Sequence, residues 1–363
     1  MKLLRNIISS LSPVGLLALQ LSCGGGGDSS GPPGVVAANI SANSSVAFTA
    51  LPGVPVTELP SVLLSDQSGT PVAGAVVTFT VTRGGGTVTG ATATSNASGV
   101  ATVGGWTLGP AAGANTLSAQ TGSLPAVTFS ACGTSTHTLG STVDTQLSTS
   151  DCQLSDGSFV DFYAVTIPTA GTYIFNQTSS TFDTYLAFLT STNVLIGTND
   201  DYLTTSTDSR LKVIVPAGSY FIGANAYDPN TTGNYSLSSA ASTAEVANCE
   251  DVFVVQGITT SQSLATTDCS TNGFFSDEYV IFLNPGQTVT VGMTSSTLDS
   301  YVEIRANGNP VALAFNDDID GTTKDARLTY TVPNTGTSAG GFFIIAAASR
   351  VPGATGAYTL TVQ

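Results

Sequence analysis

The chain has 363 residues, a length that exceeds one ordinary domain and favours two or three. Its formal net charge is −15, so nucleic acid is disfavoured as a partner because a polyanion would be repelled. Charged residues make up only 9% of the chain, while small residues and valine abound, which favours strands and tight turns over helices.

The N-terminal segment has the pattern of an export signal. Two basic residues precede an apolar stretch from Ile7 to Leu21, and Cys23 follows a small residue and precedes a glycine run. The segment is similar to a bacterial lipoprotein signal, although Gln20 stands where such signals usually carry leucine. The resemblance implies a signal peptide over 1–22, lipidation at Cys23 and a Gly/Ser-rich tether over 23–34, in an outer-membrane lipoprotein. The alternative is an ordinary cleaved signal peptide.

Residues 35–131 predict a β-sandwich, because short apolar strands alternate with Gly, Pro and Asn turns. Trp106, the single tryptophan of the chain, is expected in the core rather than in a ligand site. Five motifs together resemble the group 1 bacterial immunoglobulin-like domain of invasins and intimins: Leu59–Asp66, Gly69–Phe79, Gly84–Gly86, Ala97–Ala101 and Gly105–Gly109. The resemblance implies a spacer that displays other domains.

The remaining chain is an internal repeat, with one copy over 132–243 and a second over 244–363. Each copy contains the same blocks in the same order, and each ends on Gly-x-Tyr-x-Leu. The matched blocks are Asp151–Cys152 with Asp268–Cys269, Asp161–Tyr163 with Asp277–Tyr279, Thr178–Tyr185 with Thr294–Tyr301, Asn199–Asp201 with Asn316–Asp318, and Asp208–Leu211 with Asp325–Leu328. The order of the blocks resembles the bacterial pre-peptidase C-terminal domain, a β-sandwich appended to secreted proteases and collagenases. The fold prediction is therefore all-β, with one immunoglobulin-like sandwich followed by two jelly-roll-like repeats.

The cysteines divide into two equivalent pairs and one odd residue. Four cysteines permit three connectivities, but the identical local spacing favours Cys132–Cys152 and Cys249–Cys269. Cys23 is then the odd cysteine, which agrees with its predicted lipidation. A metal or redox role is disfavoured because the chain contains no Cys-x-x-Cys motif.

The repeated acidic and amide residues are candidate calcium ligands. Calcium takes six to eight oxygen ligands, which an Asn-Asp-Asp turn assisted by nearby aspartates can supply. The alternative is that these residues form Asx-turns with adjacent ion pairs. The candidates are Asp183, Asn199, Asp200, Asp201 and Asp208 in the first copy, and Asp299, Asn316, Asp317, Asp318 and Asp325 in the second.

Two tyrosines in equivalent strands are candidate ligand-binding residues. In the second copy, alternation places Leu298 and Val302 on the buried face of a strand and Tyr301 on the wet face. By register, Tyr185 is expected on the wet face of the first copy, beside Asp183.

Catalytic motifs are missing. The single histidine, His137, lies in a predicted linker, and neither a Gly-x-Ser-x-Gly elbow nor a zinc-protease motif accompanies it. A glycosidase carboxylate pair is disfavoured, since both copies share their acids. The sequence therefore predicts no enzyme.

The leading hypothesis is a non-catalytic, lipid-anchored envelope protein that displays two binding modules for polysaccharide or for an extracellular protein. One alternative is an accessory subunit of a secreted protease, which captures substrate or assists folding. Another is a purely structural spacer stiffened by calcium.

Overall fold

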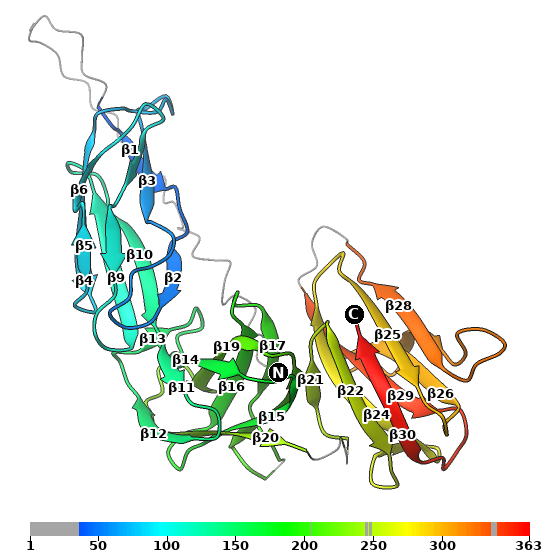
Figure 1. The fold of residues 1–363 in the computed structure, drawn as a ribbon. Helices are drawn as coiled ribbons and strands as arrows, with labels where there is room; N and C mark the ends of the chain where they lie inside the picture. Colours follow the sequence, from blue (N-terminus) through cyan, green and yellow to red (C-terminus); the bar gives the residue numbers. More distant parts are fainter. Residues whose placement is uncertain (1–35, 204, 244–245, 247–248, 335–339) are drawn as a thin grey trace, which may run out of the picture. The chain divides into compact units, whose positions relative to one another are not determined.

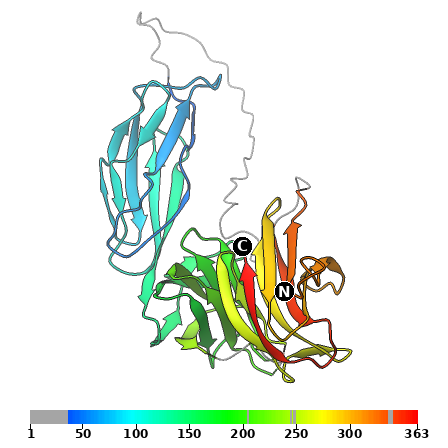
Figure 2. The same ribbon diagram turned by 45° about the vertical axis from the view of Figure 1, so that its right-hand side comes forward.

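The structure is a computed structural model that describes residues 36–203, 205–243, 246, 249–334 and 340–363. This part of the chain is all-β and contains no helix, as predicted (Figures 1 and 2). It accordingly offers no helix of the length and hydropathy that crossing a membrane requires. The predicted signal peptide and tether, with Cys23, lie outside the described residues.

The described chain divides into two compact units. Unit 1 comprises the residues up to Ser135 together with Thr149–Gly157, and unit 2 comprises Thr136–Ser148 and Ser158–Gln363. We call the part of unit 2 up to residue 243 repeat 1, and the part from residue 249 onward repeat 2.

Unit 1 consists of three sheets with strand orders β1-β3-β7, β2-β10-β9-β4-β6 and β5-β8. Its strands are β1 (Asn39–Ala42), β2 (Ala47–Ala50), β3 (Ser61–Ser65), β4 (Val76–Arg83), β5 (Thr87–Thr89), β6 (Thr92–Thr94), β7 (Val100–Thr102), β8 (Gly105–Thr107), β9 (Gly113–Gln120), β10 (Val127–Gly133) and β13 (Cys152–Gln153). Alternate residues of β4 and β9 are buried, as expected for strands that cover a core on one face. Trp106 is fully buried there with Phe79 and Phe129, which confirms its predicted core position.

Repeat 1 contains two sheets with strand orders β11-β14-β19-β16-β17 and β12-β20-β15-β18. Its strands are β11 (Ser135–His137), β12 (Thr142–Leu147), β14 (Phe159–Ile167), β15 (Gly171–Thr178), β16 (Thr184–Thr190), β17 (Leu195–Asn199), β18 (Ser209–Val215), β19 (Gly218–Ala226) and β20 (Gly233–Ser242). Phe175 and Phe188 stack in its core with ring centroids 4.8 Å apart.

Repeat 2 has the same two strand orders, β24-β29-β26-β27 and β22-β30-β25-β28, so the internal repeat in the sequence is a repeat in the fold. Its strands are β21 (Val252–Val254), β22 (Ile258–Leu264), β23 (Cys269–Thr271), β24 (Phe274–Leu283), β25 (Thr288–Thr294), β26 (Ser300–Ala306), β27 (Ala312–Asn316), β28 (Ala326–Thr331), β29 (Gly341–Ser349) and β30 (Gly356–Val362).

Strand β21 joins the two repeats into one continuous sheet. It pairs in parallel with β18 of repeat 1 and with β24 of repeat 2. Phe253 of β21 packs into the core of repeat 1, whereas Val252 and Val254 pack into the core of repeat 2. The alternation of side chains along this short strand therefore stabilises both cores at once.

Candidate functional site

A buried network of two tyrosines and one aspartate explains part of the repeated sequence. In repeat 1, Tyr163 and Tyr235 lie 2.6 Å apart through their hydroxyls, and the Tyr235 hydroxyl donates to Asp161 Oδ2 at 2.7 Å. Burial, reinforced by the charge of Asp161, raises the pKa of Tyr235 above its ordinary value of 10.0, which keeps the phenol protonated.

Repeat 2 contains the same network. The hydroxyls of Tyr279 and Tyr358 lie 2.6 Å apart, and Tyr358 donates to Asp277 Oδ2 at 2.5 Å. Burial, with the neighbouring Tyr279 and Asp277, raises the pKa of Tyr358 well above 10.0. These residues are structural, because they lie inside the sandwich and recur in both copies.

Asp208 and Asp325, the aspartates of the last matched block of the repeat, each hold a loop. Asp208 Oδ1 accepts a hydrogen bond from the backbone N–H of Ser179 at 3.1 Å. Asp325 Oδ1 accepts the equivalent bond from Ser295 at 3.0 Å. One role for both residues is thus to fix the equivalent loops, between β15 and β16 in repeat 1 and between β25 and β26 in repeat 2.

The Asn-Asp-Asp turns are also held by local hydrogen bonds. Asn199 Oδ1 accepts from the backbone of Arg210 at 2.8 Å, and Asn316 Oδ1 accepts from Arg327 at 2.9 Å. The side-chain amide of each asparagine donates to the backbone of the second aspartate, Asp201 or Asp318. Each asparagine thus ties its turn to the strand that follows, although neither side-chain oxygen accepts from the N–H two residues on, as an Asx-turn requires.

The acidic candidates do not converge on one point. The described residues include no group of three His, Cys, Asp or Glu side chains able to hold a metal ion. In repeat 2, Asp299 pairs with Lys324 at 3.0 Å, and Asp317 pairs with Arg350 at 3.1 Å. In repeat 1, the carbonyl of Asp183 accepts a backbone hydrogen bond from Tyr227. Calcium binding by these residues stays a prediction.

The predicted position of Tyr185 on a solvent-facing side of its strand is wrong. Its side chain is 6% exposed, because both faces of β16 are buried in repeat 1. The alternation of side chains along a strand predicts one buried and one solvent-facing side. This holds for β26 but not for a strand that is covered on both sides. Tyr301, expected on the wet face, is half-buried, and its hydroxyl donates to Glu303 Oε2 at 3.1 Å.

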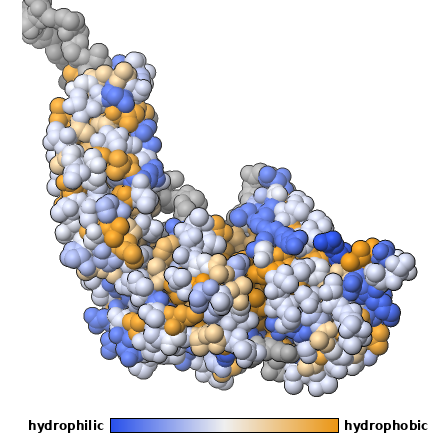
Figure 3. All heavy atoms as spheres, viewed as in Figure 1, coloured by the Kyte–Doolittle hydropathy of each residue, from blue (hydrophilic) through white to orange (hydrophobic). Residues whose placement is uncertain are grey.

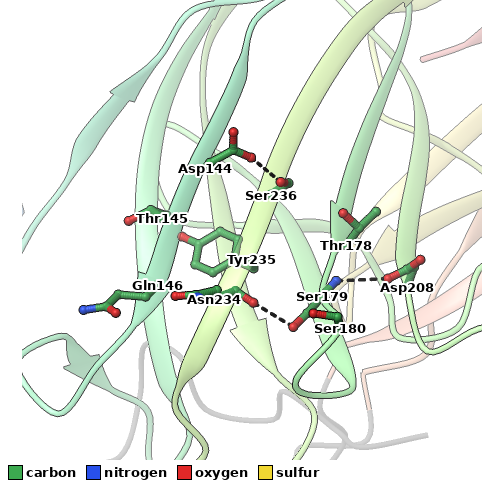
Figure 4. A pocket seen from close by; sticks show the side chains of 10 residues that line it. All are labelled: Asp144, Thr145, Gln146, Thr178, Ser179, Ser180, Asp208, Asn234, Tyr235 and Ser236. Carbon is green, nitrogen blue, oxygen red and sulfur yellow. Dashed lines mark hydrogen bonds between the residues drawn. The ribbon is translucent and has the colours of Figure 1, made fainter.

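An open polar groove of about 790 Å³ lies on repeat 1 (Figure 4). Strands β12 and β20 form one wall, and the loop after β15 forms the other. The lining residues are Asp144, Thr145, Gln146, Thr178, Ser179, Ser180, Asp208, Asn234, Tyr235 and Ser236. Most of these side chains carry a hydroxyl, an amide or a carboxylate, so the groove presents many hydrogen-bond donors and acceptors.

The walls of the groove are fixed by internal hydrogen bonds. The Ser236 hydroxyl donates to Asp144, and the Ser179 hydroxyl donates to the carbonyl of Asn234 at 2.7 Å (Figure 4). The side chains of Asp144, Gln146 and Asn234 nevertheless belong to exposed residues, so their remaining polar atoms face solvent. Such an arrangement can bind a ligand with many hydroxyl groups without first ordering the backbone.

The same place in repeat 2 lacks these residues. When Tyr358 is matched with Tyr235, the residue pairing between β22 and β30 corresponds to the pairing between β12 and β20. Asp144 and Gln146 then correspond to Ser261 and Ser263, and Asn234 corresponds to Ala357. The three larger polar side chains are therefore not a requirement of the fold.

Sequence reasoning identified only one lining residue, Asp208, and assigned it to a metal. Asp144, Gln146 and Asn234 were not predicted, because the acidic and amide candidates were positions that match between the two copies, and these three residues differ between them. The signal was present in the sequence, since three polar residues stand where the second copy has serine or alanine.

Both predicted disulfides are present. Cys132 in β10 bonds to Cys152 in β13, within unit 1, and Cys249 bonds to Cys269 in repeat 2. His137 does not lie in a linker, as was expected, but in β11. It is 2% exposed there, and its Nε2 lies 2.8 Å from the Ser239 hydroxyl.

No family model matches the chain, and no curated protein matches it. Among solved structures, the pre-peptidase C-terminal domain of a collagenase from Bacillus anthracis is 11% identical with a TM-score of 0.23, over 34% of this chain and 99% of that one. The D0–D1 domain of intimin is 16% identical with a TM-score of 0.25, over 60% of this chain and 94% of that one. Invasin, a bacterial integrin-binding protein, is 14% identical with a TM-score of 0.22, over 84% of this chain and 56% of that one. Both kinds of domain that the motifs resemble are represented, but at these TM-scores the similarities carry no argument about function.

Proposed function

We propose that the protein is a non-catalytic, lipid-anchored protein of the bacterial envelope that binds polysaccharide in the groove of repeat 1. In this proposal Cys23 carries the lipid, the immunoglobulin-like unit serves as a spacer, and the two repeats form the binding part. Several hydrogen-bonding side chains along one open groove are the single observation that carries the proposal.

The chemistry of the groove suits a sugar chain. Sugar hydroxyls both donate and accept hydrogen bonds, as do the hydroxyls and amides that line the groove, while the carboxylate of Asp144 accepts them strongly. The groove is open, so a long polymer can pass through it without an end being required. An acidic protein is suited to a neutral or basic glycan, since an anionic one would be repelled.

Two titratable groups of repeat 1 are engaged in structural hydrogen bonds, which supports binding over catalysis. The only histidine of the chain is buried and engaged with Ser239, and Asp208 accepts a backbone hydrogen bond from Ser179. Neither group is therefore arranged as an exposed general acid or base.

The test is retention on immobilised polysaccharide from a bacterial envelope. A variant with Asp144→Ala and Asn234→Ala should lose at least tenfold in affinity, since each hydrogen bond contributes about 1 kcal/mol and a charged one more. The matched control carries Ser261→Ala and Ser263→Ala at the equivalent place of repeat 2 and should bind like wild type. Equal retention of both variants would contradict a site in the groove.

A gain of binding provides the converse test. Ser261→Asp, Ser263→Gln and Ala357→Asn transfer the lining of repeat 1 to repeat 2, and the chain should then bind two equivalents of oligosaccharide instead of one. Lipid anchoring is tested separately, because Cys23→Ala should move the protein from the detergent phase to the aqueous phase. An unchanged partition would contradict the anchor without affecting the groove.

A further inference from the structure

Two carboxylates line the groove of repeat 1 without a cationic partner. Asp144 is exposed on β12, and Asp208 is half-buried beside the loop after β15, so one belongs to each wall (Figure 4). The lining contains no Lys, Arg or His, and neither carboxylate forms an ion pair with another described residue. Each accepts one internal hydrogen bond, and a carboxylate has about four acceptor positions, so both retain capacity for a ligand.

This concentration of negative charge is particular to repeat 1. Asp208 has its counterpart in Asp325, but Asp144 corresponds to Ser261, so the fold does not require a charge on the β12 wall. Charged residues make up only 9% of the chain, and on the face drawn in Figure 3 the strongly hydrophilic residues lie in small groups among nearly neutral ones. Two unpaired carboxylates in one groove therefore give it a local preference for a cation.

The groove offers no surface on which a sugar ring can stack. The apolar face of a sugar packs well against an exposed aromatic ring, which supplies a large apolar area. Tyr235 is the only aromatic residue of the lining, but it is 4% exposed, and its hydroxyl is engaged with Tyr163 and Asp161. Affinity for a sugar chain must therefore come from hydrogen bonds and charge.

Charge-assisted hydrogen bonds distinguish one class of glycan from another. A neutral hydroxyl exchanges a hydrogen bond with water for one with the protein and gains little. A hydrogen bond between ionised groups is roughly twice as strong as a neutral one, so an ammonium group gains more at Asp144 or Asp208. The hydroxyl and amide groups of Thr145, Gln146 and Asn234 suit the sugar hydroxyls between the amines better than they suit a basic peptide.

We infer that the groove selects a glycan built of amino sugars whose amines are free rather than acetylated, with ammonium groups bound by Asp144 and Asp208. This ligand class rests on the proposed function, because it names the kind of polysaccharide that the groove binds. An acetylated amine is neutral and bulkier, so it forfeits the charge-assisted bonds and weakens binding.

The experiment is calorimetric titration of the full chain carrying Cys23→Ser, which prevents lipid attachment, in weakly acidic buffer where sugar amines are protonated. The two probes are the hexamer of β-1,4-linked glucosamine and the same hexamer with every amine acetylated. The glucosamine hexamer should bind one equivalent at least tenfold more tightly than the acetylated hexamer. Raising the salt from about 0.1 M to about 1 M shortens the Debye length from about 10 Å to about 3 Å and should weaken the glucosamine hexamer selectively.

Isosteric substitutions test the role of the two charges. Asp144→Asn with Asp208→Asn removes both charges but keeps the oxygen that accepts each internal hydrogen bond. This variant should bind the glucosamine hexamer at least tenfold more weakly and change affinity for the acetylated hexamer by less than about twofold. The matched control, Asp318→Asn with Asp325→Asn, removes two charges from repeat 2 and should bind like the unsubstituted chain.

A hexamer of lysine separates sugar recognition from attraction of a polycation to an acidic chain, and it should bind at least tenfold more weakly than the glucosamine hexamer. We reject the amino-sugar class if the acetylated hexamer binds as tightly, if neither sugar binds, if the isosteric variant keeps its affinity, or if the control or the lysine hexamer contradicts these expectations. The proposed function is decided separately by retention on envelope polysaccharide: retention that Asp144→Ala with Asn234→Ala abolishes would uphold the groove even where the amine preference fails.

Discussion

Removal of the Tyr358 hydroxyl should destabilise unit 2 and leave unit 1 unchanged. The substitution Tyr358→Phe deletes the 2.5 Å hydrogen bond to Asp277 and the 2.6 Å contact with the Tyr279 hydroxyl. A hydrogen bond to a charged group contributes about 1.5–3 kcal/mol and a neutral one about 1 kcal/mol. We therefore expect a loss of about 2–4 kcal/mol in the free energy of unfolding of unit 2.

Two optical signals separate the units in one urea titration. Trp106, the only tryptophan, is buried in unit 1, so its fluorescence follows unit 1, whereas far-ultraviolet circular dichroism follows the whole chain. The fluorescence transition should stay in place while part of the dichroism transition moves to lower urea. The control, Tyr202→Phe, alters an exposed ring and should change stability by less than about 0.5 kcal/mol. The reasoning is refuted if Tyr358→Phe behaves like this control.

Three further predictions follow from the same contacts. Because burial raises the pKa of Tyr235 and Tyr358, their contribution to stability is present below pH 10 and is lost above it, so alkaline melting temperatures should fall less steeply after substitution of both by phenylalanine. Burial lowers the pKa of His137 below 6.5, so the unfolded chain takes up a proton that the folded chain resists; stability should fall as the pH drops below 6.5, and His137→Gln should reduce that slope in acid melting curves. Because the repeated aspartates and asparagines bond to backbone groups instead of converging, calcium and a chelator should give equal melting temperatures, and a calcium-dependent rise would contradict the view that these side chains only hold loops.

Much of the architecture could be predicted from the sequence because its causes are local. Strand alternation in β26 correctly separated Val302 from Tyr301, and the identical cysteine spacing correctly predicted both disulfides. The buried position of Trp106 was also predicted correctly. Each of these features depends on a short segment and on the burial of one face.

The errors occurred where distant segments decide the environment. Tyr185 obeys the same alternation as Tyr301, but β16 is buried on both faces, which no local pattern reveals. His137 lies four positions after the end of β10, where the sequence predicts a linker, yet Ser239, about a hundred residues away in the sequence, contacts its ring. The groove was missed for a related reason, since Asp144 and Asn234 come together only through the pairing of β12 with β20.

The most direct test of the account is a crystal structure of the protein with an oligosaccharide fragment of an envelope polysaccharide that it retains. We predict that the sugar lies in the groove of repeat 1, with its hydroxyls bonded to Asp144, Gln146 and Asn234. A fragment bound elsewhere on the chain, with the groove filled only by solvent, would contradict the account.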